Sequence, residues 1–155
     1  MSISRREDGF TLVELMMVVA ILGVLLAIAI PYVLGLRHAA QDRAAHSDLR
    51  NVLLAEKMVW LQSGAYTDDL GILGDVRPGA RLSVDPGQGV YADRNDADDQ
   101  VVCLVRASAS GRVWSIWESA VSGTHYGDTD LSAADCPGAL PAGYQPAGSP
   151  RGRTF

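Results

Sequence analysis

The chain contains little basic charge. Lys57 is its single lysine, and 13 lysines and arginines face 18 aspartates and glutamates, which gives a net charge of −5. Proteins that bind nucleic acid nonspecifically need a basic surface, so this balance argues against such binding as the main role. The length of 155 residues has room for one small domain besides an N-terminal segment.

Charge is missing altogether from residues 15–36. About 20 apolar residues in a helix span roughly 30 Å of hydrocarbon, so this run is long enough to cross a bilayer. Arg5 and Arg6 precede it, and the positive-inside rule therefore places the N-terminus in the cytoplasm. Glu14 stands at the start of the run. A carboxylate costs about 2.5–3.5 kcal/mol at the membrane centre and less near its edge, so Glu14 needs a partner.

The sequence also lacks the cleavage site of a secretory signal peptide. The small residue Gly9 comes before the apolar run, and no Ala-x-Ala site follows the run. Instead the run continues through Pro31 into a helical pattern. Because Pro31 removes one helical hydrogen bond and has Gly23 and Gly35 nearby, a bend or a local melt of the helix is expected there.

One long helix is predicted from Thr11 to about Ser63, with Gly64 as its C-terminal stop. Its first half, residues 10–36, is apolar all round. Its second half, residues 37–63, is amphipathic. The apolar positions of that half recur at helical spacing, and the charged residues fall mostly on other faces: Ala45, Leu49, Val52, Leu53, Val59 and Trp60 against Arg43, Asp48, Arg50, Glu56 and Lys57.

Short strands are expected in a globular, β-rich region at 64–136. The candidates are residues 81–85, 89–92, 101–107 and 112–118, and the last two flank a hairpin turn at 108–111. An antiparallel sheet of these strands would cover the apolar stripe of the helix, which is an α+β fold.

The last of these strand candidates alternates apolar and polar side chains. Trp114 and Ile116 alternate with Val113 and Ser115, which predicts one buried and one exposed face of the sheet. Trp117 then points away from Trp114, either exposed or covered by the tail. That tail, residues 137–155, is rich in Pro and Gly and is expected to be flexible.

The two cysteines, Cys103 and Cys136, both follow the membrane segment. An oxidising compartment outside the membrane predicts a disulfide between them, worth roughly 3–4 kcal/mol in the chain-entropy model. The alternative is a pair of free buried thiols.

No catalytic motif is present. The nucleophile pattern G-x-S-x-G does not occur, and His38 and His46 are eight residues apart rather than at the i, i+4 spacing of a metal pair. They are expected to be surface histidines, as is His125. We therefore expect no enzyme activity and no cofactor.

Two acidic segments suggest calcium as an alternative to solvated loops, because hard cations prefer clustered carboxylates. The first contains Asp93, Asp96 and Asp98, and the second contains Asp128 and Asp130. The first run lacks the sixth-position glycine and the twelfth-position glutamate of an EF-hand. A solvated loop is the preferred interpretation.

The residues Gly9-Phe10-Thr11-Leu12-Val13-Glu14-Leu15 carry a family resemblance. They are similar to the class III signal of type IV pilins and the related pseudopilins. Pro31, the twenty-second residue counted from Phe10, stands where such proteins often have a proline. A long helix, a final sheet and a late cysteine pair also resemble the pilin fold.

This resemblance implies that a membrane aspartyl prepilin peptidase would remove the leader, residues 1–9, between Gly9 and Phe10. The peptidase would then methylate the new amine of Phe10. Glu14 becomes the fifth mature residue, whose carboxylate in this family meets the N-terminal amine of a neighbouring subunit and sets the register. The apolar helices would leave the bilayer together and pack as the core of a filament.

The resulting hypothesis is a prepilin, a structural subunit of a type IV pilus-like filament. It would start as a single-pass protein of the cytoplasmic (inner) membrane and end in a cell-surface pilus or an envelope filament. Its expected partners are further copies of itself, the prepilin peptidase, the assembly platform and minor pilins, with DNA only in a competence pilus. The alternatives are a pseudopilin of type II secretion or DNA uptake, and a membrane-anchored binding domain that never polymerises.

Overall fold

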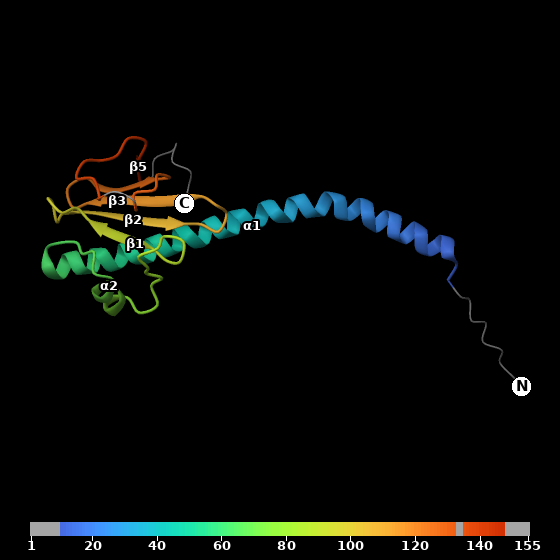
Figure 1. The fold of residues 1–155 in the computed structure, drawn as a ribbon, viewed down its shortest axis with the longest axis horizontal. Helices are drawn as coiled ribbons and strands as arrows, with labels where there is room; N and C mark the ends of the chain where they lie inside the picture. Colours follow the sequence, from blue (N-terminus) through green and yellow to red (C-terminus); the bar gives the residue numbers. More distant parts are fainter. Residues whose placement is uncertain (1–9, 133–134, 148–155) are drawn as a thin grey trace, which may run out of the picture. The chain divides into compact units, whose positions relative to one another are not determined.

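The computed structural model describes residues 10–132 and 135–147. The chain divides into two compact units after Arg37. In order, the elements are α1 (Leu12–Ser63), α2 (Leu70–Val76), β1 (Tyr91–Arg94), β2 (Val101–Ala107), β3 (Val113–Ser119), β4 (Gly123–Gly127) and β5 (Gln145–Pro146). The strands form one antiparallel sheet in the order β1-β2-β3-β4-β5. The predicted α+β class, a long N-terminal helix with an antiparallel sheet, is confirmed (Figure 1).

Helix α1 begins and ends with recognisable caps. Thr11 is its N-cap, and the Thr11 hydroxyl accepts a hydrogen bond from the Glu14 backbone N–H at 3.3 Å. At the other end Gly64 has a φ of 78°, and its N–H donates to the Trp60 carbonyl at 2.8 Å. Gly64 therefore stops the helix as expected, because a residue without Cβ enters the left-handed region at little cost.

The first half of α1 is apolar and uncovered. Every residue from Phe10 to Ala40 is exposed. Pro31 lies within the helix, which continues without a break on both sides. The predicted local melt is therefore absent, and the bend stays a prediction.

In the second unit, the inner face of α1 packs on one face of the sheet (Figure 1). The buried positions repeat every three to four residues along the helix and meet alternate residues of β2 and β3. This core contains Ala45, Leu49, Val52, Leu53, Ala55, Val59, Tyr66, Leu73, Val90, Ala92, Val102, Leu104, Trp114 and Ile116.

The other face of the sheet is buried as well, so the prediction of one exposed face is wrong. Trp117 is only 2% exposed, and its indole N–H donates to the Pro137 carbonyl at 2.8 Å. The Cys103–Cys136 disulfide and Tyr144 belong to the same cluster. The C-terminal segment folds back over the sheet, so of the two alternatives for Trp117 the cover by the tail is the one found.

Three other expectations about the sheet need correction. Residues 81–85 form no strand and contribute only a parallel bridge from Leu82 to Val90. Strands β4 and β5 were not predicted, since β4 (Gly-Thr-His-Tyr-Gly) carries no apolar run and β5 has only two residues. Residues 137–147 are not a loose tail, because Tyr144 is 6% exposed and β5 pairs with β4. Residues 148–155 lie outside the described part of the chain.

Candidate assembly site

The predicted site residues at the N-terminus lie around the start of α1. Gly9, and with it the leader, lies outside the described residues. Phe10 is 81% exposed, so the rest of the described chain leaves it largely uncovered. Glu14, one helical turn further on, is also exposed.

Thr11 and Glu14 form a reciprocal capping box. The Thr11 backbone N–H and hydroxyl both donate to Glu14 Oε2, at 3.1 Å and 2.9 Å. In return, the Thr11 hydroxyl accepts from the Glu14 backbone N–H. Two N–H groups that the helix leaves without partners are thereby satisfied, and the carboxylate lies at the positive end of the helix dipole. The carboxylate is thus oriented within one turn of Phe10 before any other subunit arrives.

Thr11 is a site residue that the sequence reasoning missed. The signal is present, because threonine followed three residues later by glutamate, directly before an apolar run, is the sequence pattern of a capping box. The same residues also belong to the family signal and border the membrane run, and these two features conceal the local role of Thr11 at the helix N-terminus.

Behind this box the helix surface is apolar and unprotected. Large hydrophobic side chains from Leu12 to Leu36 are between 48% and 74% exposed. Among the described residues, α1 is the one helix that is long and apolar enough to cross a membrane, judged by length and composition. Water-exposed apolar surface of this extent marks an interaction site for lipid or protein.

A comparison of the sequence with protein-family profiles matches residues 4–30 to a family described as "Prokaryotic N-terminal methylation motif". The chain carries a prokaryotic N-terminal methylation motif. The match spans the charged head, the Gly9–Phe10 junction, the capping box and most of the apolar run. It agrees with the resemblance seen in the sequence.

Curated relatives are similar over part of the chain. The type IV major pilin protein PilA of Myxococcus xanthus is 38% identical over 69 residues, which are 44% of this chain and 31% of the relative. The type II secretion system core protein G of Pseudomonas aeruginosa is 39% identical over 62 residues, 40% of this chain and 44% of the relative. The chain thus spans less than half the length of these two relatives.

A third relative matches beyond the helix. The type IV wide pilus major component PilA4 of Thermus thermophilus is 27% identical over 110 residues, which are 71% of this chain and 80% of the relative. A match of 110 residues is longer than helix α1, so the similarity extends into the globular unit.

The two acidic segments are structured by hydrogen bonds within the protein. Asp93 Oδ2 accepts from the Cys136 backbone N–H at 2.7 Å, and burial is the main cause of the raised pKa of Asp93. Asp130 Oδ1 accepts from the backbone N–H and the hydroxyl of Ser132. Within residues 10–132 and 135–147, no three Asp, Glu, His or Cys side chains come together in a group able to hold a metal ion. We assign no metal to these segments.

Glu56 was expected on a polar face of α1, but it is fully buried. Its Oε2 accepts from the Thr67 backbone N–H at 3.2 Å, whereas its Oε1 has no hydrogen-bond partner. Burial, helped by the nearby charge of Asp68, raises the pKa of Glu56 to about 8. The carboxyl is therefore mostly protonated at neutral pH.

Two of the three predicted surface histidines are in fact packed. The His46 ring lies 4.3 Å from the Trp114 ring, and burial lowers the pKa of His46 to about 4. His125 is 8% exposed and meets the edge of Trp117. His38 is exposed, as expected.

Proposed function

We propose that this chain is a structural subunit of a type IV pilus-like filament, with a type II secretion pseudopilus as the second candidate. One observation carries the proposal: a methylation motif leads directly into a long, uncharged stretch of helix in which every residue is exposed. That surface has to be covered by lipid first and by neighbouring helices afterwards. The role is structural rather than catalytic. The second candidate is kept because the type II secretion system core protein G of Pseudomonas aeruginosa is also similar to this chain, at 39% identity over 62 residues.

Processing would begin at the membrane, with the N-terminus in the cytoplasm. A prepilin peptidase hydrolyses the peptide bond between Gly9 and Phe10 and transfers a methyl group to the new amine. Both residues lie before the capping box, so the cut leaves the start of α1 intact. The mature chain would keep the Phe10 amine one turn from its own Glu14.

Glu14 would then select the position of the next subunit. Between apolar helices the local dielectric constant is low, so the Glu14 carboxylate and the charged amine of a neighbouring Phe10 attract strongly. An unpaired carboxylate in the same place is penalised. Assembly would therefore favour the one axial position at which the two charges meet.

Other proteins of the machine would complete this scheme. We propose the assembly platform and minor pilins as partners, and DNA only for a competence pilus. The third hypothesis, a binding domain that stays in the membrane, differs in one measurable respect, because it requires no cut at Gly9.

Mass spectrometry of the mature protein tests the proposal. The expected N-terminal peptide starts with N-methylated Phe10. A Gly9→Ala control should accumulate as the uncut precursor, because a side chain at this position would crowd the peptidase site. Wild-type material that still begins at Met1 in cells assembling filaments would contradict the proposal.

A further inference from the structure

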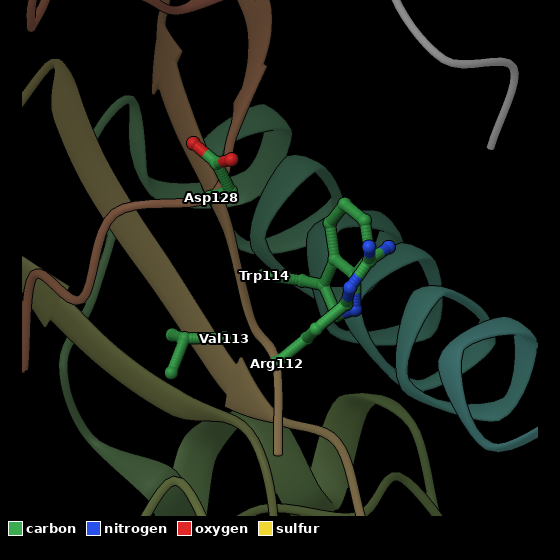
Figure 2. Close-up of a pocket in the computed structure, with 4 residues that line it drawn as sticks. All are labelled: Arg112, Val113, Trp114 and Asp128. Carbon is green, nitrogen blue, oxygen red and sulfur yellow. The ribbon is translucent and has the colours of Figure 1, made fainter. Parts of the chain in front are cut away.

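A small pocket lies at the end of the sheet where the β2–β3 hairpin turns. It has a volume of about 230 Å³ and is lined by Arg112, Val113, Trp114 and Asp128 (Figure 2). The Arg112 guanidinium lies 5.7 Å from the Trp114 ring centre and 3.8 Å from the Asp42 carboxylate. The Arg112 side chain is still 55% exposed. A guanidinium has five N–H donors, so Arg112 is held in place with donors left for another anion.

At the opposite end of the sheet, residues 95–100 form an acidic loop. Asp96, Asp98 and Asp99 are exposed, and none of the ion pairs among the described residues includes them. The loop is ordered from within, since Gln100 donates from its backbone to Asp98 Oδ1 at 3.0 Å and from its side chain to Asp99 Oδ1 at 2.8 Å. A loop already held in one conformation loses little entropy when it binds.

The acidic loop cannot reach the pocket of its own chain. The loop ends where β2 begins, at Val101, whereas Val113 of the pocket pairs with Ala107 at the far end of β2. Seven residues of strand separate the two ends by roughly 20 Å. An ion pair between the loop and the pocket can therefore form only between two copies of the chain.

We infer that globular units dock head to tail, with the acidic loop of one copy in the Arg112–Trp114 pocket of the next. The charges of the two surfaces are complementary in both directions. Asp96 and Asp98 face Arg112, and Arg94, which lies at the same end of the sheet in β1, faces Asp128. Two different surfaces of one chain form this contact, and such contacts produce open filaments rather than closed pairs. The inference rests on the proposed filament function and names its interface outside the helix.

Charge reversal on either side tests this interface in cells that assemble the full-length chain. We expect Arg112→Glu and the double variant Asp96→Arg/Asp98→Arg each to lower the yield of sheared filaments about tenfold, since like charges then oppose each other. Combining all three substitutions should restore the yield to within about twofold of wild type. Asp75→Arg reverses the charge of one exposed carboxylate on α2, as each substitution in the acidic loop does, and should leave the yield unchanged.

The rescue separates docking from folding. Arg112→Glu also places a carboxylate near Asp42, and Asp98→Arg removes the acceptor of the Gln100 backbone N–H. The single variant Asp96→Arg changes only an exposed carboxylate that accepts none of the loop's hydrogen bonds, so it should melt like wild type and still lower the filament yield. Wild-type yield from the double variant, or no rescue in the combination, overturns the interface. If filaments form and Phe10 is methylated in every variant, only the interface fails. If wild type gives neither filaments nor methylated Phe10, the proposed function fails and the interface with it.

Discussion

At the residue scale, two glutamates of α1 lie in opposite surroundings. Glu14 is exposed and accepts two hydrogen bonds from Thr11, whereas Glu56 is fully buried with one oxygen unpartnered. The first can exchange its local partner for a group on another molecule at little cost. The second is best kept neutral, because a buried carboxylate without a positive partner is penalised.

Substitution of Glu14 distinguishes its capping role from its charge. Glu14→Ala should be cut and methylated normally but enter filaments poorly. Glu14→Gln can still cap Thr11, since glutamine also serves in a capping box, yet it carries no charge. If charge pairing sets the register, the Gln variant assembles as poorly as the Ala variant in a sheared-filament assay. Wild-type yield from Glu14→Gln would show that capping suffices.

Glu56 makes the stability of the protein depend on pH. Its pKa is about 8 in the folded state against an ordinary 4.5, so the folded state binds the proton more tightly than the unfolded state. The protonated Glu56 contributes its full stabilisation below about pH 4.5, and this contribution is lost as the pH rises towards 8. Each unit of difference between the folded and unfolded pKa corresponds to at most about 1.4 kcal/mol in the free energy of unfolding. The melting temperature should therefore fall between about pH 5 and pH 8.5.

Glu56→Gln should flatten this pH profile and raise the melting temperature at about pH 8.5. The amide can keep the hydrogen bond from the Thr67 N–H and carries no charge at any of these pH values. Asp75→Asn, which removes an exposed carboxylate from α2, is the matched control and should leave the profile unchanged. A profile in Glu56→Gln as steep as in wild type would exclude Glu56 as its cause.

At the element scale, the C-terminal segment converts a two-layer arrangement into one with both sheet faces covered. The disulfide joins this segment to β2, and the Trp117 indole bonds to the Pro137 carbonyl. Tyr144 packs in the same cluster as Trp117 and the disulfide, and its hydroxyl forms a hydrogen bond with the Ser115 hydroxyl. The segment contains four prolines after Cys136, a composition that predicts no regular structure, so only its contacts reveal its role.

Gly127, at the end of β4, makes room for this segment. A Cβ at Gly127 would overlap the ring of Tyr144. Gly127→Ala should therefore displace Tyr144 and lower the free energy of unfolding by about 1–3 kcal/mol, measured by denaturant titration. At Gly138 the nearest atoms are 3.6 Å or more from the place that a Cβ would take, so Gly138→Ala is the control and should stay near wild type. Equal stability of the two variants would refute the tight fit of Tyr144.

At the scale of the whole molecule, the chain carries two kinds of surface. The apolar surface of residues 10–36 is compatible with lipid and with other helices of its kind. The globular unit is compatible with water and carries charges of both signs at opposite ends of its sheet. Under the proposed function, the first surface drives assembly and the second chooses how neighbours are oriented.

The amino-acid sequence alone determined the features that depend on neighbouring residues. Short patterns, composition and the compartment predicted the uncharged run, the Gly64 stop, strand β2 and the disulfide partners. Helix propensity, helix capping and hydrophobicity act over a few residues, which is why these features could be predicted.

The tertiary structure decided the features that depend on contacts between distant parts of the chain. The burial of Glu56 required the segment at Thr67 to fold back onto α1, and the burial of Trp117 required the C-terminal segment to cover β3. The placement of Arg112 and the acidic loop at opposite ends of the sheet required the register of β2 and β3. Contacts between residues distant in sequence form only when the loop-closure entropy is offset by packing, and no local pattern encodes that balance.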